Sequence, residues 1–229
     1  MKLIQQILKI AGKDNFQFDE RINTRYIAGL CLDYGLMMIR GKIKSLGYSN
    51  ISKNVFIGKK VRLYSKRNLT VGSKTKIKNG SKIDALSSEG IVIGAQCVFG
   101  ENTRIECTGS LSCLGRGVAI GDRTTFGSDC FFGAAGGITI GSDVVAGQYI
   151  RFHSENHNYK DKDLLIREQG VTHKGIKIGN NCWIGSGAVF LDGAEIGDGC
   201  VVAANAVVTK KFPDDSVIGG IPAKIISER

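Results

Sequence analysis

An apolar residue recurs at every sixth position near the C-terminus, and this period constrains the fold more than any other feature of the chain. An α-helix favours a period of 3.6 and a half-buried strand a period of 2, so neither explains a period of six. A fixed short repeat is typical of a solenoid, in which each repeat is one small structural unit. In residues 178–210 the repeated positions are Ile178, Ile184, Phe190, Ile196, Val202 and Val208.

The same pattern extends back to about residue 51. We expect a very short strand as one flat side of a coil and a turn as its corner, with three sides closing a triangular coil. The repeated apolar residue points inward, and the glycine that often follows it suits a tight turn, where a side chain is costly. The pattern therefore predicts an all-β solenoid of hexapeptide repeats whose coils stack on their neighbours. Further repeated positions are Leu114, Ile120, Phe126, Phe132 and Ile138, and then Ile140, Ala146 and Phe152.

Residues 1–48 differ from the rest and predict a short N-terminal helical segment before a solenoid domain over 49–229. Leu3, Ile4, Ile7 and Leu8 form one helical stripe, and a second helix is expected from Asn23 to Ser45. Residues 1–50 carry eight Lys or Arg against four acidic residues. Such a segment can lie on an anionic membrane surface, or its apolar face can pack on the solenoid or another subunit. Both alternatives remain open.

Composition excludes several classes. The net charge of +10 suits phosphate or an anionic surface, but no RNA-binding or helix-turn-helix pattern is present, so we expect no nucleic-acid partner. The seven cysteines form no C-x-x-C, which predicts small core residues in a reducing cytosol and no metal site. The N-terminus lacks a secretory cleavage site, and the apolar stretch at 26–47 is too charged to span a bilayer. We expect a cytoplasmic protein.

The repeat is interrupted at residues 151–176, which predicts an excursion loop near 153–175. This segment contains all three histidines of the chain, His153, His157 and His173. A long loop that leaves a regular solenoid is usually functional.

From Thr139 onward the chain resembles the hexapeptide-repeat acyltransferases. The resemblance depends on "CWIGSGAVFLDGAEIGDGCVVAANAVVTK" followed by "IGGIPAKII". It is close to the maltose and galactoside O-acetyltransferases, and closer still to the sugar O-acetyltransferases of surface-polysaccharide gene clusters. The resemblance implies a left-handed parallel β-helix, a homotrimer with sites between neighbouring prisms, acetyl-CoA as co-substrate and a sugar or glycan acceptor.

His157 is the general base that the resemblance implies, because counting from Thr139 places it on the family's histidine without a gap. A neutral imidazole can take the proton of a sugar hydroxyl as that hydroxyl attacks the acetyl thioester. Glu155, two residues earlier, either orients this imidazole or is a solvated carboxylate. Asp129 lies near a polar substrate-binding position of the family. We expect His153 and His173 to be an ordinary strand residue and an ordinary loop residue.

The resemblance also assigns contacts to acetyl-CoA. Small residues let the pantetheine arm approach the backbone, while the threonine and the lysines meet the nucleotide and its phosphates. The family often has arginine where Lys224 stands, and lysine keeps the charge without the bidentate fork. We expect Trp183, next to the inward Ile184, to face outward. The implied contacts are Ser186, Ala204, Thr209, Lys210 and Lys224.

The sequence thus predicts an acetyl-CoA-dependent O-acetyltransferase that acts on a sugar hydroxyl in surface-polysaccharide biosynthesis. The alternatives are an amino-sugar N-acetyltransferase, a metal-dependent carbonic anhydrase on the same solenoid, and a non-catalytic scaffold. The three histidines lack the spacing of the carbonic anhydrase. The sugar-recognition residues of the maltose and galactoside enzymes have no counterpart in residues 1–50, so the acceptor does not follow. A lipid-linked glycan would give the basic segment a role in peripheral contact with the inner membrane face.

Overall fold

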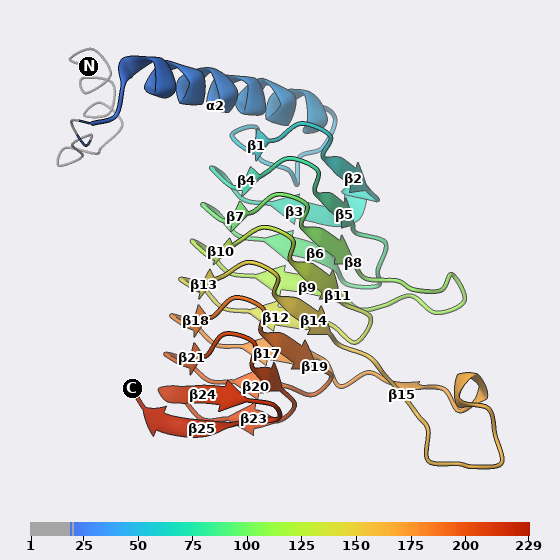
Figure 1. Cartoon of the computed structure of the whole chain (residues 1–229). Coiled ribbons are helices and arrows are strands. Elements are labelled where there is room, and N and C mark those ends of the chain that lie inside the picture. The colour runs from blue at the N-terminus through green and yellow to red at the C-terminus, as the bar shows by residue number, and fades with distance from the viewer. Residues whose placement is uncertain (1–18, 20) are drawn as a thin grey trace.

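The chain forms a three-sided prism of stacked coils with one long helix across its N-terminal end (Figure 1). The computed structural model describes residue 19 and residues 21–229. The predicted stripe of Leu3, Ile4, Ile7 and Leu8 lies outside the described residues. No helix in the described part of the chain is both long enough and apolar enough to cross a membrane.

Three sheets form the sides of the prism, and we call them the first, second and third faces in the order in which each coil crosses them. The first face contains β1 (Phe56–Ile57), β4 (Lys76–Ile77), β7 (Val98–Phe99), β10 (Thr125–Phe126), β13 (Val145–Ala146), β18 (Trp183–Ile184), β21 (Val201–Val202), β24 (Ser216–Gly220) and β25 (Ala223–Glu228). The second contains β2 (Arg62–Tyr64), β5 (Lys82–Asp84), β8 (Arg104–Glu106), β11 (Phe131–Gly133), β14 (Arg151–His153), β19 (Val189–Leu191) and β22 (Val207–Val208). The third contains β3 (Leu69–Val71), β6 (Gly90–Ile93), β9 (Gly117–Ile120), β12 (Ile138–Ile140), β17 (Ile176–Ile178), β20 (Glu195–Ile196) and β23 (Lys211–Phe212).

The strands within each face pair in parallel, except for the closing antiparallel pair β24–β25. This register stacks each inward residue on its equivalent in the next coil. Phe132 pairs with Phe152, which pairs with Phe190, and their ring centroids are 4.8 and 5.1 Å apart. The stacked side chains are fully buried and form one continuous core along the prism axis.

The predicted inward positions are confirmed apart from Leu114, which is 48% exposed. Between β8 and β9 the chain leaves the coil as a loop over residues 107–116, so Leu114 has the right spacing but no strand to place it inward. Trp183 faces outward as expected and is 61% exposed.

The glycine after the inward residue stands where a side chain is costly, as expected, and the structure shows why. Gly121 does not take a positive φ; that conformation falls two residues later, on Arg123, whose φ is 56°. A Cβ on Gly121 would lie 2.6 Å from the backbone nitrogen of Ser142 and 2.7 Å from the carbonyl carbon of Gly141. Glycine is required because the next coil passes too close for any side chain, and not because of its conformational freedom.

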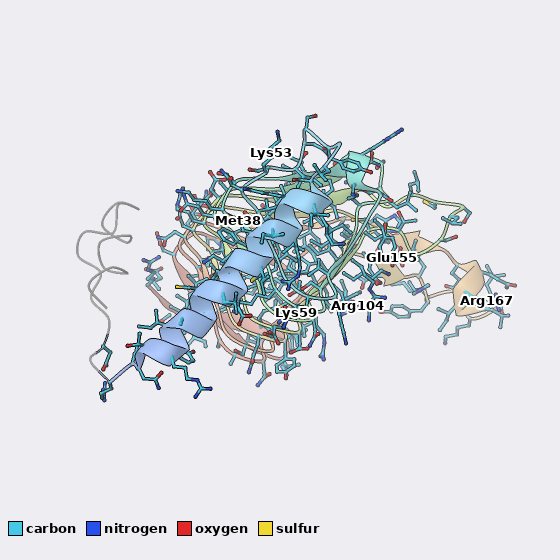
Figure 2. All side chains as sticks on the ribbon, turned by 90° about the horizontal axis from the view of Figure 1, so that it is seen from above. Met38, Lys53, Lys59, Arg104, Glu155 and Arg167 are labelled. Carbon is cyan, nitrogen blue, oxygen red and sulfur yellow. The ribbon has the colours of Figure 1, made fainter. Side chains whose placement is uncertain are left out.

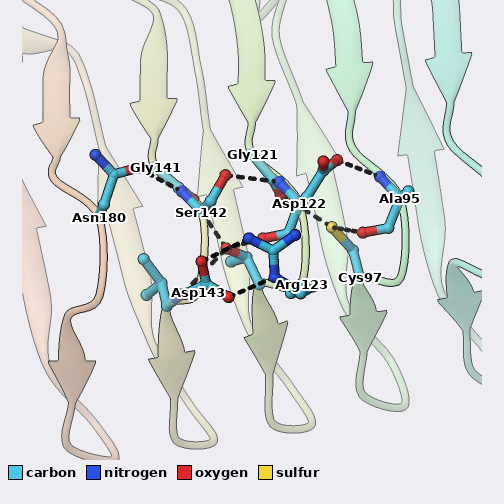
Figure 3. Close-up of polar contacts among 11 residues, drawn as sticks. Ala95, Cys97, Gly121, Asp122, Arg123, Gly141, Ser142, Asp143 and Asn180 are labelled. Carbon is cyan, nitrogen blue, oxygen red and sulfur yellow. Dashed lines mark hydrogen bonds and ion pairs between the residues drawn. The ribbon is translucent and has the colours of Figure 1, made fainter.

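A ladder of hydrogen bonds runs along the corner after the third face and fastens each coil to the next (Figure 3). Asp122 Oδ1 accepts from the backbone N–H of Ala95 at 2.7 Å, and Ser142 Oγ accepts from that of Asp122 at 3.0 Å. Asn180 Oδ1 accepts from the N–H of Ser142 at 2.9 Å. These short polar side chains therefore satisfy backbone donors that the tight corner leaves without a strand partner. Asp198 and Asp214 continue the ladder.

Helix α2 (Thr24–Lys44) matches the prediction of a helix between Asn23 and Ser45, and both flanking residues cap it. Asn23 Oδ1 accepts from the N–H of Tyr26 at 2.8 Å, and the N–H of Ser45 donates to the carbonyl of Gly41. Gly41 leaves no room for a Cβ against the carbonyl of Val55, so the C-terminal half of α2 sits directly on the first coil. The helix covers the open end of the core, as a terminal cap of a solenoid must.

The expectation that the seven cysteines are core residues is wrong for Cys31 and Cys113, because both are exposed. The other five are buried, and burial raises the pKa of Cys107, Cys130 and Cys182 to about 11. These thiols stay protonated at neutral pH and behave as small apolar side chains.

We predict that Gly121→Ala lowers the free energy of unfolding by about 1–3 kcal/mol, the usual cost of overpacking. The matched control is Gly35→Ala in α2, where a Cβ meets nothing within 4 Å. Because alanine is the better helix former, the control should gain about 0.5–1 kcal/mol. Denaturant unfolding measures both changes, and a Gly121→Ala variant as stable as the unaltered protein would contradict the close-approach explanation.

Candidate functional site

The excursion leaves the corner between the second and third faces, after β14, and returns at β17. Figure 1 shows it extending away from the prism. Its base is a two-stranded antiparallel ribbon of β15 (Asn156–His157) and β16 (Val171–Thr172), in which His157 pairs with Val171. The predicted excursion is therefore present, and a ribbon rather than a free loop positions His157.

Two buried polar side chains anchor the ends of the ribbon. Where the chain leaves the prism, Ser154 Oγ donates to the carbonyl of Gly133 at 3.0 Å and accepts from the N–H of Gly136 at 2.9 Å. Where it returns, the carboxylate of Asp192 accepts from Thr172 Oγ1 at 3.1 Å and from the backbone N–H groups of Lys174 and Gly175, both at 2.8 Å. The ribbon's position thus depends on hydrogen bonds to the rigid coils.

Sequence reasoning missed Asp192. Its signal was a carboxylate at an inward position: it follows the buried Phe190 by two residues, as the buried Ala134 follows Phe132. Buried carboxylates need hydrogen-bond donors, so an acid at such a position indicates a partner segment that the repeat itself does not supply.

Glu155 does not have the partner that the sequence suggested. Its Oε2 lies 2.6 Å from Nε2 of His173, and this contact joins the outgoing and returning limbs of the excursion. The idea that Glu155 orients the imidazole of His157 is therefore corrected, because Glu155 precedes the paired part of the ribbon and turns toward the opposite limb. His173, expected to be an ordinary loop residue, is instead part of this link.

His157 is exposed and lines an open hollow in the excursion together with Asn158, Tyr159 and Lys160. The hollow keeps its shape through Gln169, whose Nε2 donates to the carbonyls of Asp161 and Leu164 at 2.7 and 2.9 Å. An acceptor can therefore approach the imidazole from solvent, while the backbone around it is fixed by hydrogen bonds.

A second hollow, of about 230 Å³, lies on the second face beside the base of the excursion. His153 lines it, with its ring centroid 5.5 Å from that of Phe131. Burial, and secondarily the charge of Arg151, lowers the pKa of His153, so this imidazole is neutral at physiological pH. The hollow thus combines an aromatic wall with a neutral histidine.

The carboxylates of Glu106 and Glu155 also line this second hollow. Glu106 accepts from Lys82 Nζ at 3.0 Å and from Arg104 Nη2 at 2.9 Å. Burial by itself would raise the pKa of Glu106, but the hydrogen bonds from Arg104 and Lys82 outweigh it and lower the pKa. Glu106 is therefore ionised and can accept hydrogen bonds from hydroxyl groups, as can Glu155, which lines the same hollow.

The residues expected to contact the cofactor gather in the last coils. Ser186 and Ala204 lie on consecutive coils at the corner between the first and second faces, and Thr209 and Lys210 lie at the corner between the second and third. Lys224 is in β25, paired with β24. The two corners border the C-terminal part of the second face, whose outward side chains there are Val189, Leu191 and Val207.

Asp129 is not brought near His157 within one chain. It occupies a corner between the first and second faces with a φ of 60° and accepts from Asn102 Nδ2 at 3.2 Å, whereas the ribbon leaves the corner between the second and third faces. Over residue 19 and residues 21–229, no three His, Cys, Asp or Glu side chains group in a way that could hold a metal ion.

Two families of hexapeptide repeats match the sequence of this chain, one on each side of the excursion. "Bacterial transferase hexapeptide (six repeats)" matches residues 175–210, and "Hexapeptide repeat of succinyl-transferase" matches residues 117–148. The matched segments contain the inward Phe132 and Phe190 and the close-approach Gly121 described above.

Proteins with similar sequences are named as acetyltransferases. The chain is 30% identical over 138 residues to an Escherichia coli (strain K12) protein with the name "Putative lipopolysaccharide biosynthesis O-acetyl transferase WbbJ", and the match covers 57% of this chain and 70% of that protein. It is 31% identical over 161 residues to a probable acetyltransferase of Mycobacterium tuberculosis, covering 63% and 54%. It is also 35% identical over 92 residues to the galactoside O-acetyltransferase of Escherichia coli, covering 40% and 44%. The last two matches span about half of each relative.

The chain therefore belongs to the hexapeptide-repeat acyltransferase family. A solved N-acyltransferase from Bacillus cereus, in complex with dTDP and coenzyme A, has the same fold, with a TM-score of 0.55 at 16% identity over 82% of this chain and 88% of that one.

Proposed function

We propose that the protein is an acetyl-CoA-dependent O-acetyltransferase that acts on a sugar hydroxyl in surface-polysaccharide biosynthesis, with His157 as general base. The observation that carries the proposal is an exposed imidazole on a ribbon whose two ends are anchored to rigid coils by Ser154 and Asp192. The names of the Escherichia coli relatives support the reaction class and the kind of acceptor.

In this reaction His157 takes the proton of the acceptor hydroxyl while the hydroxyl oxygen attacks the thioester carbonyl of acetyl-CoA. The tetrahedral intermediate collapses, the carbon–sulfur bond breaks, and the coenzyme A thiolate leaves and is reprotonated. No covalent enzyme intermediate is needed when both substrates meet in one cleft. We assign Ser186 and Ala204 to the pantetheine arm, and Thr209, Lys210 and Lys224 to the nucleotide end. The coils are proposed to wind left-handedly, as in the family.

The hollow around His153 suits the acceptor. Phe131 offers a flat apolar surface for a sugar ring, and the carboxylates of Glu106 and Glu155 can accept from its hydroxyls. An amino sugar is a second candidate acceptor, favoured by the fold shared with the Bacillus cereus N-acyltransferase. Mass spectrometry of the product separates an O-acetyl ester, which alkali cleaves, from an alkali-stable amide.

His157→Ala should lower kcat by about 10²–10⁴, the usual share of general-base catalysis, while acetyl-CoA affinity stays unchanged. His153→Ala should cost much less, because that imidazole packs beside Phe131 and is not assigned the proton. Acetyl transfer to surface-polysaccharide sugars, followed by mass spectrometry, measures both. Full activity in His157→Ala, or equal losses in the two variants, would refute this assignment.

We also propose a homotrimer with sites between neighbouring prisms. Asp129 and the ribbon occupy different corners of one prism, so a neighbouring chain could bring such corners together in a closed cyclic assembly. Light scattering should give three times the 24.6 kDa chain mass, and a stable monomer at micromolar concentration would contradict the trimer.

A cytoplasmic location with peripheral contact at the inner membrane face completes the proposal. Apolar side chains on α2 remain exposed, including Leu32 at 65%, and the last turn of the same helix carries the basic Lys42 and Lys44. The protein should sediment with anionic vesicles, less so in added salt and not with neutral vesicles. Leu32→Gln should weaken sedimentation, whereas Leu111→Gln, an 86% exposed leucine on the 107–116 loop, should not. Equal recovery with anionic and neutral vesicles would count against membrane contact.

A further inference from the structure

The positive charge of this protein is concentrated at one end. Residues 34–83 contain thirteen Lys or Arg and no Asp or Glu, although the whole chain has 31 basic and 21 acidic residues. This segment forms the second half of α2, the first coil and most of the second coil. The remainder of the chain is slightly acidic, so the charge is a property of the N-terminal end of the prism and not of the solenoid as a whole.

A cavity of about 250 Å³ lies between α2 and the first face at this end. Its helical side presents an apolar patch of Leu30, Tyr34 and Met37, flanked by Asp33 and Arg40 of the same helix. Its coil side carries Lys59, Lys76 and Lys78 from the first two coils, with Asn79 and Glu101 beside them. Figure 2, which looks down on the helix, shows Lys59 beside it. The cavity thus combines an apolar patch on the helix with four basic side chains, which outnumber its two carboxylates.

The four cations of this cavity lack acidic partners. Over the described residues none of them forms an ion pair, whereas Lys82 on the next strand of the second coil does, as do Arg123 and Lys211 in later coils. Lys76 Nζ instead lies 4.9 Å from the ring centroid of Tyr34. Of the two carboxylates that line the cavity, Glu101 accepts from Asn79 Nδ2 at 3.1 Å, and Asp33 is on the helix. Several like charges held around one cavity repel each other, and a bound anion would remove that repulsion.

We propose that this cavity binds the phosphate or diphosphate group of an amphiphilic ligand, with the ligand's apolar chain against α2. The four basic side chains suit a multiply charged phosphate, for which lysine ammonium groups and a planar arginine are the usual ligands. The apolar patch continues outward into the exposed Tyr26 and Leu30 of the same helix, which gives an apolar chain a path to solvent or to a bilayer. A lipid phosphate satisfies both groups of side chains, whereas a soluble phosphate satisfies only the basic ones.

This site is separate from the proposed acetyl-CoA contacts. Those residues lie in the last coils and in β25, at the opposite end of the stack (Figure 1). The inference goes beyond the proposed function, and its test measures binding without acetyl transfer, so either can fail without the other.

The test is calorimetric titration of the full-length protein with farnesyl diphosphate, below its micelle-forming concentration. Inorganic pyrophosphate and a uridine-diphosphate sugar provide the soluble phosphate arms, and farnesol provides the chain without the phosphate. We expect one farnesyl diphosphate per chain, bound at least about tenfold more tightly than any of the three comparison probes, because only this probe uses both the apolar patch and the basic side chains.

The double variant Lys76→Gln with Lys78→Gln should weaken binding about tenfold or more, since each lost charge-assisted hydrogen bond to phosphate is costly. The matched control is Lys60→Gln with Lys74→Gln, which removes the same charge from exposed corner positions outside the cavity, one in the first coil and one in the turn into the second. The control should change affinity by less than about twofold, because exposed charges at a distance are screened. Thermal unfolding of each variant verifies that it is folded.

Three results would overturn the proposal. Absence of farnesyl diphosphate binding would remove the site. Equal affinity for pyrophosphate or the sugar nucleotide would reduce it to a soluble-phosphate site without a role for the apolar patch. Equal weakening by the two double variants would assign the binding to the general positive charge of this end.

Discussion

The close stacking of coils is the constraint on which the rest of the structure depends. Neighbouring strands in a sheet are about 4.8 Å apart, so each corner lies directly against the corner of the next coil. At Gly121 that contact leaves no space for a Cβ beside Ser142, and the polar side chain at the following position bonds to the previous coil. The glycine and the short polar residue therefore have complementary roles. The glycine lets the next coil approach closely, and the polar side chain accepts a hydrogen bond from a backbone N–H of the previous coil.

The candidate site lies where the longer of the two described loops, residues 154–175, interrupts this regularity. There the prism holds the chain by two buried groups, Ser154 at the exit and Asp192 at the return. Catalysis by proximity requires a base that is held in place although it is exposed to its acceptor. A ribbon anchored at its ends meets both requirements, because His157 is open to solvent while its backbone is paired with Val171.

The two ends of the prism differ in chemistry as well as in structure. The C-terminal end closes with the β24–β25 pair, next to the coils assigned to acetyl-CoA. The N-terminal end closes with α2, whose Gly41 contacts the first coil and which leaves apolar residues exposed next to the basic segment 34–83. In a solenoid each coil contacts only its neighbours, so the ends can acquire separate functions without disturbing the core.

Local patterns in the sequence were enough to predict the stacked coils, the inward residues from Ile120 onward and the boundaries of α2, because repeat period and helix caps are properties of nearby residues. They could not predict the partner of Glu155, which is His173, eighteen positions away, or the clamp at Asp192. They also did not reveal that the next coil is what makes a side chain costly at Gly121, and they wrongly placed Leu114 inward. These features were decided by the tertiary structure, because each depends on which side chains and backbone of another coil or limb lie within contact distance, and the period alone does not specify that.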